Sequence, residues 1–138
     1  MSSFSEKVMK SLKLLTSRMS KLETSNIKNE TVKIFSGTIN EGSSATVTEA
    51  ITNFRYLLIR TGNTATYIQV PVLINSSVLR GINTYTANTQ LEIFSVVATH
   101  SNKGMTFNLE RTGNWAIKES GNVNAHGYTN VTEIYGIR

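Results

Sequence analysis

The chain has 138 residues and no cysteine, so its length suits one compact domain with an appendage, and neither a disulfide bond nor a thiolate metal site can contribute to the fold. Its longest apolar runs, 56–59 and 70–74, fall far short of the roughly 20 residues that span a bilayer, so we expect no membrane insertion. The net charge of +5 is concentrated in residues 1–33, which carry +4, and the nearly neutral remainder makes nucleic-acid binding by that part unexpected.

The first 26 residues repeat apolar side chains on a heptad. Neither proline nor glycine occurs in residues 1–36, so nothing interrupts a helix there. Most of the basic side chains fall at heptad positions b, c and f, where we expect them to face solvent. The sequence therefore predicts a helical stalk over residues 1–30, with an oligomerisation seam made of Val8, Leu12, Leu15, Met19 and Leu22.

Two arrangements of this helix remain open. Most helical stability in proteins comes from packing of an amphipathic face, so the apolar stripe needs cover. Copies of the same helix could supply it in a coiled coil, and Asn26 at an a position would then favour one register. Alternatively the stripe, widened by Phe4, Met9 and Leu14, packs on the chain's own head. We favour the coiled coil and expect a homo-oligomer.

From Val32 onward the apolar period changes from about 3.5 to 2, which is typical of β-strands. Short strands of this number and spacing predict a mainly β head over residues 31–138, built as an antiparallel β-sandwich or a jelly-roll-like barrel. The predicted strands are 32–39, 45–51, 54–60, 65–73, 91–99, 104–110, 114–119 and 130–137.

Alternation is clearest over residues 105–110, where Met105, Phe107 and Leu109 share a face that we expect in the core. The next four residues, Arg-Thr-Gly-Asn at 111–114, predict a tight hairpin.

Pro71 lies inside an apolar run and indicates an edge strand, a bulge or a strand end. Residues 75–90 are rich in Asn, Ser and Thr and are expected to form a long loop, a plausible binding element on a small β-domain.

Side chains that support catalysis or metal binding are sparse. Aspartate is absent, and neither a nucleophile elbow nor a phosphate-binding glycine loop occurs. His100, expected at a strand end, and His126, expected in a loop, have no ligand-type spacing. We therefore expect no catalytic residue, no metal site, no cofactor and no enzymatic activity, although a glutamate pair of a cell-wall-degrading enzyme is an alternative that composition alone leaves open.

Aromatic side chains on a β-surface can bind sugars, but Tyr and Trp in strands usually pack against their neighbours. Tyr85 and Tyr128 occur in polar, loop-like settings. These two residues are the predicted ligand-binding candidates.

Two stretches of the head resemble bacteriophage tail and fibre proteins. Residues 37–39 (GTI) and 44–59 (SATVTEAITNFRYLLI) are similar to the strand, alternating strand, hydrophobic-x-x-F-x-x-L and strand order of phage β-sandwich tips. Residues 131–138 (VTEIYGIR) look like the short I-x-x-I-Y-G-I-K ending of many such proteins. Together these stretches cover about 30 of the 138 residues.

The resemblance implies a trimeric component of the virion, in the tail, baseplate or fibre. Its N-terminal helix would attach to other virion proteins, and its C-terminal head would face outward to bind a host-surface glycan or protein, or would decorate the particle. The family has no catalytic signature, and no receptor-binding residue can be carried over. The alternative is a cellular carbohydrate- or peptide-binding β-sandwich module that uses the same head without a particle.

Overall fold

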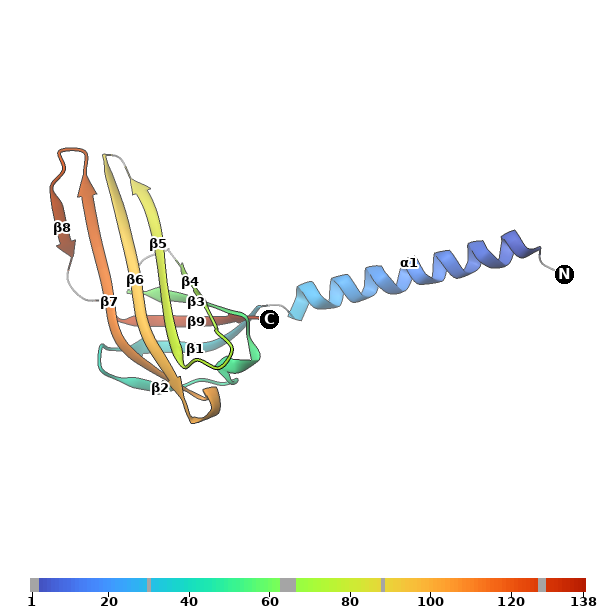
Figure 1. Cartoon of the computed structure of the whole chain (residues 1–138), viewed down its shortest axis with the longest axis horizontal. Coiled ribbons are helices and arrows are strands. Elements are labelled where there is room, and N and C mark those ends of the chain that lie inside the picture. Colours follow the sequence, from blue (N-terminus) through green and yellow to red (C-terminus); the bar gives the residue numbers. More distant parts are fainter. Residues whose placement is uncertain (1–2, 30, 63–66, 88, 127–128) are drawn as a thin grey trace. The chain divides into compact units, whose positions relative to one another are not determined.

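The computed structural model describes residues 3–29, 31–62, 67–87, 89–126 and 129–138. The chain divides into two compact units, Met1–Thr31 and Val32–Arg138. The first unit contains one helix, α1 (Phe4–Asn29), drawn in blue in Figure 1. The backbone N–H of Glu6 donates to Ser3 Oγ over 3.3 Å, so Ser3 caps the start of this helix. The N-terminal helix that the heptad predicts is confirmed.

The second unit contains strands and two short 3-10 helices. The 3-10 helices are η1 (Ile51–Asn53) and η2 (Asn102–Gly104). The described strands are β1 (Thr31–Ile39), β2 (Ser44–Thr46), β3 (Tyr56–Thr61), β4 (Tyr67–Pro71), β5 (Val78–Ala87), β6 (Gln90–Ser101), β7 (Thr106–Lys118), β8 (Val123–His126) and β9 (Val131–Ile137).

These strands form two antiparallel sheets, which Figure 1 shows as two crossing layers. The four-stranded sheet has the order β1-β9-β3-β4, and the five-stranded sheet has the order β2-β7-β6-β5, with β8 also pairing with β7. The mainly β fold of two antiparallel sheets, preceded in the chain by an N-terminal helix, is therefore confirmed.

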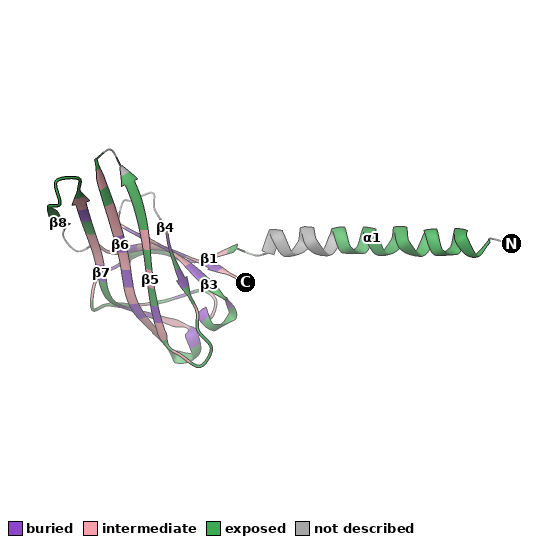
Figure 2. Ribbon diagram, turned by 45° about the horizontal axis from the view of Figure 1, so that its top comes forward, coloured by how far each residue is buried: buried purple, intermediate pink, exposed green. Residues whose placement is uncertain are grey.

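The core lies between the sheets and appears as the purple bands in Figure 2. Burial of one such side chain stabilises a fold by about 2 kcal/mol. The four-stranded sheet contributes Ile34, Leu57, Ile59, Ile68 and Ile134, and the five-stranded sheet contributes Leu79, Phe94, Val96, Phe107 and Leu109.

Close approach of backbone and aromatic side chains also shapes the head. A Cβ on Gly136 would lie 2.5 Å from ring carbons of Phe54, so only glycine leaves room for this buried ring. A Cβ on Gly81 would lie 2.7 Å from the carbonyl oxygen of Gln69, which lets β5 of one sheet approach β4 of the other.

Several strand predictions are confirmed. Phe107 and Leu109 are buried and Met105 is half-buried, so their shared face does contribute to the core. Pro71 is the last residue of β4, and β4 is an edge of its sheet, where the missing N–H costs no ladder hydrogen bond.

The hairpin predicted at residues 111–114 is wrong. β7 runs unbroken through this segment. Its pairing with β6 contains a β-bulge, at which Glu110 has no partner on β6. Gly113 sits inside the strand and not in a turn. The turn comes later, where the N–H of Lys118 donates to the carbonyl of Asn122 over 3.0 Å.

The loop predicted at residues 75–90 is also wrong, because β5 occupies most of it and pairs with β6 along its whole length. Pairing with a central strand outweighs the weak β propensity of Asn and Ser. The predicted strand 45–51 is wrong beyond its second residue, since β2 ends at Thr46 and η1 begins at Ile51. His126 belongs to β8, not to a loop.

Candidate functional site

Within its own unit, helix α1 leaves its apolar seam uncovered. Figure 2 colours the ribbon of its described residues green, and every residue from 4 to 20 is exposed. The exposed fractions along the seam are 39% for Val8, 52% for Leu12, 57% for Leu15 and 54% for Met19. The side chain of the fifth seam residue, Leu22, lies outside the described residues. The helix therefore brings four predicted seam residues onto one exposed face.

The predicted ligand-binding tyrosines have different outcomes. Tyr85 is exposed, as expected, but it lies in β5 opposite Glu92 and not in a loop. Tyr128 lies outside the described residues. The described part of the chain therefore assigns no common site to these two tyrosines.

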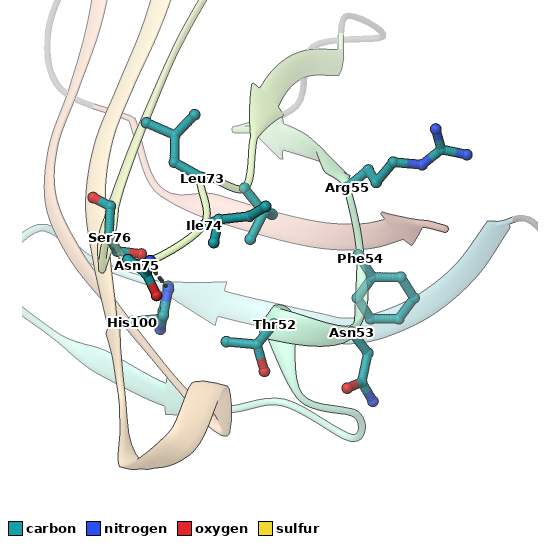
Figure 3. A pocket seen from close by; sticks show the side chains of 10 residues that line it. Thr52, Asn53, Phe54, Arg55, Leu73, Ile74, Asn75, Ser76 and His100 are labelled. Carbon is teal, nitrogen blue, oxygen red and sulfur yellow. Dashed lines mark hydrogen bonds between the residues drawn. The ribbon is translucent and has the colours of Figure 1, made fainter.

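A cavity of about 610 Å³ opens beside the loop between β4 and β5 (Figure 3). The loop presents Leu73 and Ile74, which are 55% and 91% exposed. The residues that line the cavity are Thr52, Asn53, Phe54, Arg55, Val72, Leu73, Ile74, Asn75, Ser76 and His100.

His100 lines this cavity, and its contacts show a structural role. Its Nε2 lies 3.1 Å from the carbonyl oxygen of Ser76, the dashed line in Figure 3, and its backbone N–H donates to the carbonyl of Ser77. Arg55 extends away from His100 in the same view. No carboxylate is among the described residues that line the cavity, so they offer no acid/base pair.

A second polar cluster surrounds Glu133 on β9. The hydroxyl of Tyr67 donates to Glu133 Oε2 over 2.8 Å, and Lys33 Nζ and Arg60 Nη1 each lie 3.5 Å from a carboxylate oxygen. Tyr135 stacks edge-on against Tyr67, with ring centroids 5.8 Å apart, and lies under Lys33. Each oxygen of this carboxylate therefore has a hydrogen-bonding or cationic partner.

Two carboxylates of the head have lowered pKa values, as expected for groups held in place by hydrogen bonds and cations. The hydrogen bond from Tyr67, supported by Lys33 and Arg60, holds the pKa of Glu133 below its ordinary value. The hydrogen bond from Arg138, 2.7 Å long, likewise lowers the pKa of Glu49. A general acid at neutral pH needs a raised pKa, so neither group is suited to that role.

Other classes of site have no support in the described residues. No group of three or more His, Cys, Asp or Glu side chains lies close enough together there to hold a metal ion. Within the same residues, no helix combines the length and the apolar character needed to cross a membrane.

Comparison of the chain with protein-family models, with curated proteins and with solved structures gives no match. The assignment of function therefore depends on the chain's own residues.

Sequence reasoning missed both the cavity and the Glu133 cluster. Their members are distant in the chain, for example Lys33 and Glu133, and become neighbours only through strand pairing. The exposed Leu73-Ile74 pair had a local signal, an apolar run that follows a strand-ending proline, but it resembled the interior of a strand.

We predict that Glu133→Gln lowers the urea midpoint at pH 7. A carboxylate with a lowered folded-state pKa stabilises the fold above its ordinary pKa of 4.5, and this contribution disappears as the pH falls through the folded-state value. The difference between the variant and the native chain should therefore shrink steadily below pH 4.5. Glu110→Gln is the control, because Glu110 is exposed and has no ion pair with another described residue. A pH-independent difference would contradict the charge-based account.

Proposed function

We propose that this chain is a structural subunit of a bacteriophage virion, in the tail, baseplate or fibre. Helix α1 joins copies of the chain into a homo-oligomer, with three copies as the expected number, and links them to other virion proteins. The β head is presented for binding to the host surface or for decoration of the particle. The observation that carries the proposal is an exposed heptad seam on a helix attached to a separately packed head.

The hydrophobic effect supplies the reason for self-association. The four described seam residues lie on one face and are 39% to 57% exposed, whereas the apolar side chains of the head core are almost completely buried. Complete burial of a Leu or Met side chain contributes roughly 1.5 to 3 kcal/mol. A second helix with the same spacing offers matching knobs and holes at the a and d positions.

The residues beside the seam also fit a second copy. In parallel helices in register, a g residue of one helix lies beside the e residue five positions later on its neighbour. The three such pairs match in character, since one is apolar, one carries two hydroxyls and one has opposite charges: Phe4 with Met9, Ser11 with Thr16 and Arg18 with Glu23. An antiparallel pair places g beside g and e beside e, which loses this matching.

The virion assignment is supported by the resemblance to phage tail and fibre proteins. The stretches that carry it include the first four residues of β3 and the whole of β9, and these pair from Tyr56↔Ile137 to Ile59↔Ile134. Residues far apart in the sequence thus belong to one structural unit at the centre of the four-stranded sheet.

The seam predicts a specific effect of Leu15→Ser. We expect light scattering after size exclusion to find an oligomer of the native chain at micromolar concentration and an association at least tenfold weaker for Leu15→Ser, because a d position loses its apolar contact. Leu14→Ser is a closely matched control, since Leu14 is 53% exposed but lies at position c. A monomeric native chain, or equal effects of the two variants, would refute the proposal that copies associate through the seam.

Helix orientation can be read by cross-linking, because the native chain has no cysteine. A variant with Ser5→Cys and Asn26→Cys should form 5–5 and 26–26 disulfides between copies under mild oxidation, since both residues are at a positions. Peptide mapping distinguishes these from 5–26 links, which an antiparallel pair would form. Predominant 5–26 links would refute the parallel arrangement.

Association of the protein with phage particles distinguishes the virion hypothesis from the cellular-module hypothesis. We expect antibodies against the head to label assembled particles, and Leu15→Ser to reduce incorporation while Leu14→Ser retains it. Detection of the protein in host cells and never on particles would favour the cellular carbohydrate- or peptide-binding module instead.

A further inference from the structure

The outer face of the five-stranded sheet, opposite the core, carries an ordered group of polar and aromatic side chains. Their inward neighbours Leu79, Val96 and Thr112 are buried, so the residues between them point outward. Register across β5, β6 and β7 gives three successive rows on this face: Arg80, Val97 and Arg111 in the first, Ile82, Ser95 and Gly113 in the second, and Thr84, Ile93 and Trp115 in the third.

Trp115 is the aromatic member of this group. A Cβ on Gly113 would lie 2.3 Å and 2.5 Å from two carbons of the six-membered ring, Cη2 and Cζ3, so the indole folds back along β7 and lies over Gly113. The residue is still 37% exposed. Glycine in the second row thus leaves the space in which an aromatic side chain is held against the sheet and remains open to solvent.

Two guanidinium groups lie at the other end of the same face. Arg80 and Arg111 both neighbour Val97 on β6, one from each side, so their Cα atoms are about 10 Å apart. Both side chains are exposed, and neither forms an ion pair with another residue that the structure describes. Each presents a planar fork of donors that matches a carboxylate.

Between these two ends lie the hydroxyl of Ser95 and the side chain of Ile82, which is 66% exposed. Ser95 Oγ would lie 2.7 Å from a Cβ on Gly113, which places it beside the indole. Within the described part of the chain this hydroxyl has no hydrogen-bond partner, so its donor and acceptor are free for a ligand.

We propose that this face binds a carboxylate-bearing carbohydrate, with a sugar ring against Trp115 and its carboxylate between Arg80 and Arg111. The polarised C–H groups on one side of a pyranose are attracted to the negative face of an indole. Gly113 lies two residues from Arg111 along β7, a span of about 7 Å that one pyranose with its carboxylate fills. This assignment rests on the host-binding role proposed for the head and specifies its ligand class.

Charge favours an acidic glycan over a nucleic acid. Nucleic-acid binding draws on many phosphate contacts, and residues 34–138 carry a net charge of only +1. Two guanidinium groups suit one carboxylate per site and not a continuous backbone of phosphates.

The test uses the full chain with polygalacturonic acid as the acidic probe and its carboxyl-reduced, neutral form as the matched control. Trp115 is the single tryptophan, so its fluorescence reports occupancy of this face directly. We expect the acidic polymer to change the emission and to bind at least tenfold more tightly than the neutral one. Affinity electrophoresis should show at least fivefold weaker binding for Arg80→Gln, Arg111→Gln and Trp115→Leu.

Lys118→Gln serves as the control variant, because Lys118 is exposed but projects from the other side of β7 than Arg111 and Trp115, and its binding should equal that of the native chain. Equal binding of both polymers, no binding of either, or unchanged binding by all three site variants would overturn the proposal. Tighter binding of single-stranded DNA than of the acidic polymer would overturn it in favour of a nucleic-acid surface. Oligomeric state and labelling of particles are measured on the same variants, so failure of this site is distinguishable from failure of the virion assignment.

Discussion

Burial of apolar side chains between two crossed sheets is the interaction on which the head depends. Ile34, Leu57 and Phe107 have no exposed surface, and glycines at the points of closest approach let backbone and rings come together. The head therefore satisfies the hydrophobic effect within one chain. Helix α1 does not, because its described apolar side chains remain in contact with water. This difference between two units of one polypeptide is the physical reason for proposing self-association through the helix and display by the head.

The charged residues of the head divide in a similar way. Glu133 and Glu49 have cationic or hydroxyl partners and lowered pKa values, which identify them as structural groups. Arg80 and Arg111 lie on the outer face of the other sheet without an ion-pair partner among the described residues. The acidic glycan proposed above would supply the partner that these two cations lack among the described residues.

Short-range sequence patterns predicted the structure correctly where it depends on one helix or one strand alone. The heptad predicted α1 because neighbours on a helix face are three or four residues apart, and alternation predicted the buried face of Phe107 and Leu109 because side chains of a strand alternate. Turn chemistry at residues 111–114 was misleading, since pairing with β6 keeps Gly113 within a continuous strand. The polar segment 75–90 likewise lacked a local strand signal, and its partner β6 decides its conformation.

The sequence by itself determined the change from a helical to a strand period, the apolar seam of the helix and the shortage of catalytic side chains, because each depends on residue type and short-range spacing. Only the tertiary structure decided which residues from different strands become neighbours. Arg80, Ser95 and Trp115 are separated along the chain and share one face through the register of β5, β6 and β7. Register is a long-range property, set by how two whole sheets bury their apolar faces, and no short stretch of sequence contains it.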